Sequence, residues 1–354
     1  MAGPASNPFP SIEMQQRATG RTARWRLSTN ENEFGTAPSA VRALISCAQD
    51  AHRYPDCAHQ ALRGALARRH GVDEDAVLVA TGIDGLLAQV CRALLRPGAA
   101  VVTTAGTYPT FAYFAEAAGA AVHTVGPRRD RADAEALAEA AHRHRAALVY
   151  LAEPDNPLGG ALGAERVRRL ADQLPEPTVL VVDGAYAEYQ AAGRRLDARD
   201  VVGRRLLWLR TFSKAYGLAG LRVGYCLYDR TAVSGLEHGL EHYAVGRIAE
   251  AAALAALDDD RHLERTVALT AAGRAHYRER LAALGCRPLP SETNFVTFRV
   301  PGDPGRTGEV TDALRQRGTY VRQVHSPGRP DLIRLSVGPP AQRAEVLALL
   351  CDLL

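Results

Sequence analysis

The residue with the clearest capacity for covalent chemistry is Lys214, the only lysine among 43 Lys and Arg residues. Arginine stays protonated at any physiological pH, whereas a desolvated lysine amine can lose its proton and attack a carbonyl carbon. The product of that attack is a Schiff base. A second interpretation is that Lys214 is a chance survivor on a solvated face, since most lysines are surface residues. The residues around Lys214 favour the first interpretation.

Lys214 begins a distinctive pattern of glycine, leucine and arginine. Ser213-Lys214 is followed by Gly217-Leu218-Ala219-Gly220-Leu221-Arg222 and by Gly224-Tyr225. This pattern resembles the cofactor-lysine signature of the fold-type I, pyridoxal-phosphate-dependent aminotransferases of class I/II, and among these the histidinol-phosphate aminotransferase branch. The resemblance runs from about Leu27 to the C-terminus. It implies that pyridoxal 5'-phosphate is bound to Lys214 as an internal aldimine.

The cofactor phosphate is a dianion, so its site needs backbone donors and a fixed cation. The segment 81–84 follows an apolar run and opens a helical pattern, so amides of Ile83 and Asp84 can point at a phosphate. Taken alone, the segment fits an ordinary strand-to-helix turn. Together with Lys214, it predicts these phosphate-binding residues: Gly82, Ile83, Asp84, Thr211, Ser213 and Arg222.

An electron-accepting pyridine ring needs a proton on its nitrogen, which an anionic carboxylate can hold. Asp183 ends the apolar run 179–182 and is placed for this role, although a lone aspartate after a strand is commonly a cap or turn residue. The resemblance assigns Tyr186 and Asn156 as donors to the cofactor's 3' oxygen. It also places Tyr108 as the ring stacked on the cofactor, where the alternative is a core tyrosine.

The resemblance also implies four substrate contacts and a site shared between subunits. Arg334 matches the arginine whose planar fork holds the substrate's α-carboxylate. Arg322 matches the substrate-phosphate arginine of histidinol-phosphate enzymes. Asn32 and Gly35 match the N-terminal loop that closes over substrate. Tyr54 matches a tyrosine that reaches the cofactor phosphate of the neighbouring subunit, so the expected active unit is a homodimer.

The sequence also departs from the family pattern, on loops expected around the cofactor and substrate. The Pro-Tyr element that precedes the N-terminal loop in histidinol-phosphate enzymes is missing, so a role in histidine biosynthesis is not inferred from the sequence. Because backbone amides act at position 83, the departures bear on the substrate more than on the cofactor. The departing residues are Glu33, Ile83, Gly85, Glu153, Leu158 and Gly184.

The expected reaction is amino transfer between an amino acid, or an amine like one, and a 2-oxo acid. Lys214, Asp183 and Tyr108 are the expected catalytic residues, with Lys214 moving a proton between Cα and C4'. Oxidation, decarboxylation, and β- or γ-elimination or replacement pass through the same quinonoid and stay open, because the residues do not fix which Cα bond breaks. A pyridoxal-binding regulator would need a DNA-binding domain, for which the sequence shows no pattern.

Composition favours a cytoplasmic enzyme with a large core. The chain has 354 residues, of which 47% are hydrophobic and 23% charged. The net charge of +4 is spread among acidic residues without a basic stripe, so nucleic-acid binding is not expected. No membrane-spanning run or signal-peptide pattern is present. Six cysteines without C-x-x-C spacing predict neither disulfides nor a metal site.

Short apolar runs alternate with helical patterns, which predicts an α/β fold: a mostly parallel seven-stranded sheet between helices, followed by a small C-terminal α+β domain. The expected divisions are an N-terminal arm (1–28), a large cofactor-binding domain (29–242) and a small domain (243–354). Ligands of such sheets bind at the carboxyl ends of the strands. The seven strands are expected at 77–80, 100–103, 121–124, 147–150, 179–182, 206–209 and 222–225.

Overall fold

The computed structural model describes residues 11–303, 305–325 and 330–354. The first ten residues of the predicted N-terminal arm lie outside the described residues. In the rest of the arm, the Ser11 hydroxyl caps helix α1 (Ile12–Thr19) by accepting a hydrogen bond from the Met14 amide. Strand β1 (Trp25–Arg26) then pairs in parallel with β11 (Thr319–Tyr320), so the arm is attached to the C-terminal part of the chain.

A seven-stranded sheet in the order β2-β8-β7-β6-β5-β3-β4 forms the centre of the molecule. Among these described strands, β8 runs antiparallel to both of its neighbours, β2 and β7, and the other pairings are parallel. The predicted mostly parallel sheet is confirmed, and its strands β5, β6, β7 and β8 are buried at every position because both faces are covered. The strands are β2 (Val77–Ala80), β3 (Ala100–Thr104), β4 (Ala121–Val125), β5 (Leu148–Ala152), β6 (Val179–Asp183), β7 (Leu206–Thr211) and β8 (Gly224–Tyr228).

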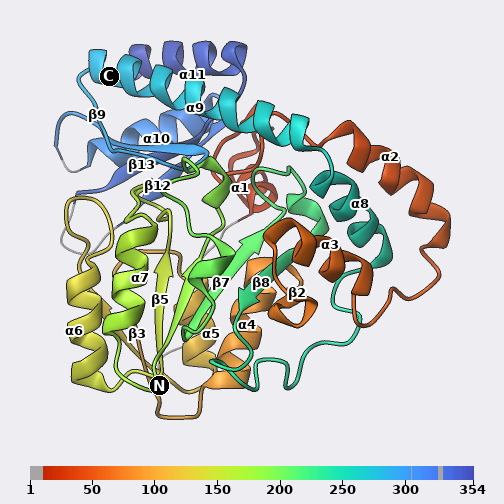
Figure 1. The fold of residues 1–354 in the computed structure, drawn as a ribbon. Coiled ribbons are helices and arrows are strands. Elements are labelled where there is room, and N and C mark those ends of the chain that lie inside the picture. The colour runs from red at the N-terminus through yellow and green to blue at the C-terminus, as the bar shows by residue number, and fades with distance from the viewer. Residues whose placement is uncertain (1–10, 304, 326–329) are drawn as a thin grey trace.

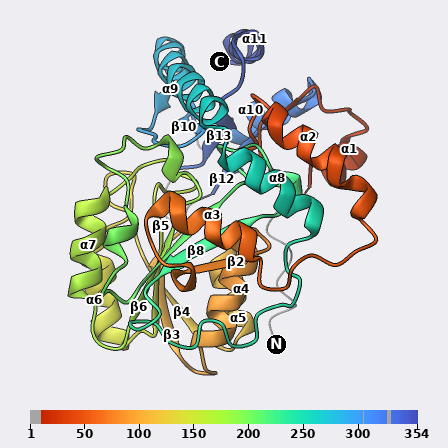
Figure 2. The ribbon, with the colours of Figure 1, turned by 45° about the vertical axis from the view of Figure 1, so that its right-hand side comes forward.

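Helices cover both faces of this sheet (Figures 1 and 2). On one face α4 and α5 bury apolar side chains such as Leu86 and Phe111. On the other face α3, α6, α7 and α8 contribute Leu62, Leu137, Val167 and Ala252 to a second core, and α2 packs along α8. These helices are α2 (Pro38–Cys47), α3 (Gln60–His70), α4 (Gly82–Leu94), α5 (Thr110–Ala117), α6 (Ala134–His144), α7 (Ala164–Gln173) and α8 (Arg247–Leu257).

A second, antiparallel sheet in the order β12-β13-β10-β9 lies beyond the large one, with the blue C-terminal helices around it in Figure 1. A core around Leu281, Leu314 and Leu350 joins it to three helices. Helix α8 follows residue 242 yet shares the core of the large sheet, and the domain limits stay a prediction. The elements are α9 (Asp260–Ala283), β9 (Arg287–Pro288), β10 (Phe295–Arg299), α10 (Arg306–Gln316), β12 (Arg322–Val324), β13 (Leu332–Ser336) and α11 (Pro340–Leu353).

Three general features of the described residues bear on function. No helix within residues 11–303, 305–325 and 330–354 is long and apolar enough to cross a membrane. Within the same ranges, no group of three or more His, Cys, Asp or Glu side chains could hold a metal ion. All six cysteines carry free thiols, and three of them are buried: Cys91, Cys226 and Cys286.

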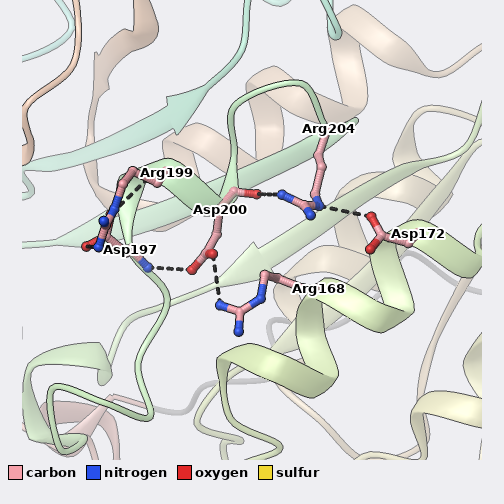
Figure 3. A network of polar contacts seen from close by, with 6 residues as sticks. All are labelled: Arg168, Asp172, Asp197, Arg199, Asp200 and Arg204. Carbon is pink, nitrogen blue, oxygen red and sulfur yellow. Dashed lines mark hydrogen bonds and ion pairs between the residues drawn. The ribbon is translucent and has the colours of Figure 1, made fainter.

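Helix α7 is tied to the segment before β7 by a network of charged side chains (Figure 3). The Asp200 carboxylate accepts hydrogen bonds from the Arg168 guanidinium at 2.9 Å and from the Asp197 amide at 2.8 Å. The Arg204 guanidinium donates to Asp172 at 2.9 Å. Asp200 is 8% exposed, so water has little access to its place. Both of its donors therefore lose their acceptor if the carboxylate is removed.

We therefore expect Asp200→Ala to lower the free energy of unfolding by about 1 to 3 kcal/mol, because Arg168 and the Asp197 amide are left without a partner. Thermal unfolding measured by circular dichroism checks the loss. Asp172→Ala, which removes an exposed partner of Arg204, is the matched control and should change the stability far less. Equal losses in the two variants would contradict the role assigned to Asp200.

Candidate active site

A pocket of about 620 Å³ lies at the carboxyl ends of β5, β6 and β7. Its wall combines these strand ends with the start of α4, the loop before α5, the segment 28–31 and strands β12 and β13. Twelve of the predicted site residues line it, which brings together side chains far apart in the sequence. These are Ile83, Asp84, Tyr108, Asn156, Asp183, Tyr186, Thr211, Ser213, Lys214, Arg222, Arg322 and Arg334.

Lys214 lies at the centre of this arrangement. Its Nζ donates a hydrogen bond to the Thr29 carbonyl oxygen at 3.0 Å and lies 5.9 Å from the centroid of the Tyr186 ring. Burial, followed by the positive charge of Arg334, lowers the pKa of Lys214 to about 8. A substantial fraction of its amine is therefore neutral near physiological pH, which is the form able to attack a carbonyl carbon.

One end of the pocket is built to hold an anion. The Arg222 guanidinium donates to the Ser213 hydroxyl at 3.2 Å and pairs with the Asp84 carboxylate at 3.3 Å. The Thr211 hydroxyl donates to the same Ser213 oxygen at 2.9 Å. Helix α4 begins at Gly82, and a Cβ added to Gly82 would lie only 2.8 Å from Arg222 Nη2. Gly82 also has a φ of 72°, which favours glycine, and a side chain there would press on the guanidinium beside the helix N-terminus, where backbone amides favour a phosphate.

Arg222 differs from the sequence expectation in its backbone. The predicted strand 222–225 begins instead at Gly224, because a 3-10 helix (Ala219–Leu221) precedes Arg222 and Arg222 itself has a φ of 55°. This left-handed conformation makes Arg222 a turn residue whose side chain lines the pocket.

Asp183 ends β6 at the other side of Lys214. Its carboxylate accepts hydrogen bonds from the Tyr150 hydroxyl at 2.7 Å and from the Ala185 amide at 3.0 Å. Burial nevertheless raises the pKa of Asp183 to about 6. A protonated ring nitrogen placed against this carboxylate would favour the charged form and lower its pKa again. The partner Tyr150 was not predicted, since its position in an apolar run gives no sign of which strand lies beside it.

Tyr108, Tyr186 and Asn156 surround the space between these two ends. The Tyr108 hydroxyl donates to Asp84 at 2.8 Å, and burial raises the pKa of Tyr108. The Tyr186 hydroxyl accepts from the Asn30 amide at 2.9 Å, and burial raises its pKa to about 12, so it remains protonated and can donate. The Asn156 side-chain oxygen accepts from Arg334, which leaves the Asn156 amide nitrogen as a donor.

Two arginines close the pocket from the small sheet. Arg322 on β12 lies directly opposite Arg334 on β13 in the antiparallel register, and both line the pocket. Arg334 is 8% exposed, and burial, with a further effect of Arg322, lowers its pKa to about 10. Burial likewise lowers the pKa of Arg322. This end of the pocket therefore attracts anions.

The remaining predicted residues act outside the pocket wall of their own chain. The Asn32 amide donates to the Ala215 carbonyl at 3.1 Å, and a Cβ on Gly217 would lie 2.4 Å from the Gly35 carbonyl oxygen. The loop with Asn32 and Gly35 therefore rests on the lysine turn and presents residues 28–31, which sequence reasoning missed, to the pocket. Tyr54 is 77% exposed and stacks on Tyr243 at 4.7 Å.

Five of the six departures from the family pattern do not line the pocket. Glu153 accepts hydrogen bonds from the amides of Leu162 and Gly163, and burial raises its pKa to about 7. Leu158 packs in an apolar cluster with residues of the small sheet. Only Ile83 is in the pocket wall of the described residues. The departures thus alter the support of the pocket more than its lining.

The donor set fits pyridoxal 5'-phosphate. An anion site at a helix N-terminus, a lysine with a lowered pKa and a buried carboxylate follow one another along the pocket. Among the described residues Asp183 forms no ion pair, and a pyridinium nitrogen would supply one. The fold and this pocket together define a pyridoxal-phosphate-dependent enzyme. When bound, such a cofactor withdraws electrons from the substrate's Cα.

Comparison with known proteins agrees with this definition. A family model described as aminotransferase class I and II matches residues 25–350. The histidinol-phosphate aminotransferase of Rhodospirillum centenum is 36% identical and covers 99% of both chains. That of Roseiflexus castenholzii is 39% identical, over 92% of this chain and 88% of its own. The crystal structure of the Sinorhizobium meliloti histidinol-phosphate aminotransferase with pyridoxal-5'-phosphate has a TM-score of 0.94 at 37% identity, covering 98% of this chain and 95% of that chain.

The chain belongs to the class I and II aminotransferases. It is a pyridoxal-phosphate-dependent aminotransferase like the histidinol-phosphate aminotransferases. The family and the cofactor predicted from the Ser213-Lys214 pattern are thereby confirmed.

Because Lys214 is the only lysine, its pKa can be measured by labelling. We expect the rate at which acetic anhydride modifies Lys214 in the apoprotein to rise through a midpoint near pH 8, where an exposed lysine would have its midpoint near 10.4. Mass spectrometry of the Lys214 peptide gives the rate. In Arg334→Leu the midpoint should move up, since a neighbouring positive charge is lost; in Arg204→Leu it should not. A midpoint near 10 in the unaltered chain would contradict the lowered pKa.

Proposed function

We propose that this aminotransferase acts on an amine whose far end carries a phosphate ester, as histidinol phosphate does, and passes the amino group to a 2-oxo acid. The observation that carries this proposal is the pairing of Arg322 with Arg334 across β12 and β13, both in the wall of the pocket. Like charges directly opposite each other on a sheet are unfavourable. A dianion between them would turn that repulsion into attraction to both guanidinium groups.

The charge of the ligand distinguishes the two candidate substrates. A planar α-carboxylate carries one charge and matches a single guanidinium fork, whereas a phosphate ester carries close to two charges and three acceptor oxygens. The buried Arg334 and the half-buried Arg322 together exceed the need of one carboxylate. The names of the relatives from Rhodospirillum centenum and Roseiflexus castenholzii, histidinol-phosphate aminotransferase, support the same substrate class.

The other residues take these roles in the proposal. The neutral Lys214 amine would accept the proton from the substrate's Cα and deliver it to the cofactor's aldehyde carbon, which is joined to Cα through the amino nitrogen. Asp183, held by Tyr150, keeps the pyridine nitrogen protonated, and Tyr108 packs on the ring. Tyr186 and Asn156 donate to the cofactor's 3' oxygen. The phosphate of the cofactor is held by these groups: the amides of Gly82, Ile83 and Asp84, the hydroxyls of Thr211 and Ser213, and Arg222.

A second candidate is amino transfer from an ordinary amino acid. It is favoured by the contact between Arg334 and Asn156, which holds one guanidinium in the same pocket as Lys214. A single guanidinium can bind an α-carboxylate without Arg322. Asn32 and Gly35, whose loop rests on the lysine turn, then close over either substrate. Decarboxylation, oxidation and elimination share the same cofactor chemistry and are distinguished by their products.

We further propose that the active unit is a cytoplasmic homodimer in which Tyr54 serves the partner's cofactor phosphate. Tyr54 is largely exposed in the single chain. Its ring stacks on Tyr243, and its carbonyl oxygen accepts a hydrogen bond from the Arg247 guanidinium at 2.9 Å. Neither of these two partners lines the pocket of the described residues. The exposed Val41 and Ile45 on α2 offer apolar area for such an interface.

The substrate proposal is tested with purified enzyme, 2-oxoglutarate, and either histidinol phosphate or histidine. We expect a higher kcat/KM for histidinol phosphate, and we expect Arg322→Ala to lower that value by about 2 to 4 kcal/mol, roughly 30- to 900-fold, because a half-buried charge contact with the phosphate is lost. The change for histidine should be several-fold smaller. Coupled assay of glutamate formation measures both.

Arg322→Lys is the matched control, since it keeps the charge and loses only the fork, and it should recover part of the loss. Equal losses for both substrates would contradict the dianion site. Release of carbon dioxide or ammonia without glutamate would instead favour one of the alternative reactions.

The shared site is tested by mixing two defective variants, Lys214→Ala and Tyr54→Ala. A heterodimer contains one site with both native residues, so an equal mixture should recover about a quarter of the native sites. Activity after subunit exchange, followed with differently tagged chains, is the measurement. Complete exchange without any recovered activity would place Tyr54 in its own chain's site or outside the site altogether.

A further inference from the structure

A buried ion pair lies beside the active site without entering it. The Arg210 guanidinium donates to the Glu188 carboxylate at 2.5 Å, and the two residues are 4% and 6% exposed. Neither lines the pocket. Arg210 directly precedes Thr211 on β7, and Glu188 lies in the 3-10 helix Ala187–Tyr189 that follows Tyr186.

The place of this pair in the sheet is informative. Backbone pairing between β6 and β7 ends with Asp183 opposite Leu209, and the Gly184 amide adds one last hydrogen bond to the Leu209 carbonyl at 2.8 Å. Beyond that point the two segments of the chain are no longer paired: one continues to Tyr186 and the other to Lys214. The Glu188–Arg210 contact is therefore a link between the two segments where the backbone ladder has stopped.

Two aromatic rings and a glycine pack closely around Arg210. Its guanidinium carbon lies 4.4 Å from the centroid of the Trp208 ring and 5.9 Å from that of Tyr225. A Cβ added to Gly184 would lie 2.6 Å from Trp208 Nε1 and 3.1 Å from Arg210 Cδ. Gly184 stands where the resembling family usually has a carboxylate. In this chain the carboxylate that contacts Arg210 is that of Glu188.

Stability alone gives a poor reason for such a pair. The cost of desolvating two charges largely offsets their attraction, so buried ion pairs can often be replaced by apolar side chains without loss. Burial acts to lower the pKa of Arg210, but Glu188 together with Tyr225 and Tyr216 outweighs burial and raises that pKa, so the guanidinium stays charged. Arg210 Nε and Glu188 Oε2 have no hydrogen-bond partner among the described residues, so the link rests on one contact.

We propose that the Glu188–Arg210 pair is a positioning element that holds the Asp183–Tyr186 segment and the Lys214 turn at one fixed separation. Both segments must contact the same cofactor, Asp183 and Tyr186 at its ring and Thr211, Ser213 and Lys214 at its phosphate and aldehyde. A fixed separation lets these groups meet a rigid ligand without first being ordered. The proposal rests on the cofactor and is independent of the proposed substrate.

The test is a double-mutant cycle of Arg210→Met, Glu188→Leu and the double variant, all as apoproteins. Each single variant leaves a lone buried charge and should have a lower Tm. The double variant has no buried charge at this place, and its Tm should return toward that of the unaltered chain. Its affinity for pyridoxal 5'-phosphate should nevertheless stay reduced by about tenfold or more, comparable to the loss of one charge-assisted contact.

The affinity is measured by ultrafiltration and absorbance of the released cofactor, so no substrate is involved. Asp200→Ala, with its network remote from the pocket wall, supplies the reference for a purely structural loss. Recovery of both Tm and cofactor affinity in the double variant would overturn the proposal. If its Tm stays low, affinity no weaker than that of Asp200→Ala would also overturn it, and weaker affinity would support it. Should a single variant not fold, Arg210→Lys and Glu188→Gln replace it under the same criteria.

Discussion

The active site depends on positive charge that the fold withdraws from water. Lys214, Arg222 and Arg334 all reach one pocket. Arg222 stays 46% exposed, whereas burial lowers the pKa of Lys214 to about 8 and that of Arg334 to about 10. Such a concentration is unfavourable until anionic groups enter. A cofactor phosphate at one end and a substrate anion at the other would satisfy it. The free energy that these neighbouring positive charges cost without a ligand therefore contributes to the affinity for anionic ligands.

The fold meets this cost by placing the charges on rigid supports. Asp183 and Thr211 end neighbouring strands, and Gly82 begins helix α4 beside Arg222. The two substrate-side arginines come from a different sheet, β12 and β13. Under the proposed function, the electron-withdrawing chemistry and the recognition of the substrate's far end thus have separate structural supports. A change in one sheet can alter substrate choice while leaving the groups that hold the cofactor in place.

Much of this arrangement could be predicted from the sequence, because it depends on local patterns. The apolar runs gave the strands, and the Ser213-Lys214 pattern led to the family and cofactor. What could not be predicted depends on pairing between distant segments. The contact of Tyr150 with Asp183 requires β5 to lie beside β6, and the opposition of Arg322 and Arg334 requires a particular antiparallel register. A register shifted by one residue would send one arginine to the other face.

The departures from the family pattern show the same distinction between local identity and tertiary role. Glu153 replaces a residue expected near the cofactor, yet its carboxylate accepts two backbone amides at the start of α7. Leu158 joins the loop of Asn156 to apolar residues of the small sheet. Both residues act on the loop that carries a pocket residue rather than on the ligand. Sequence differences at these positions can therefore change how firmly Asn156 is held without changing which groups face the substrate, and this is why they do not by themselves argue against a phosphate-bearing amine.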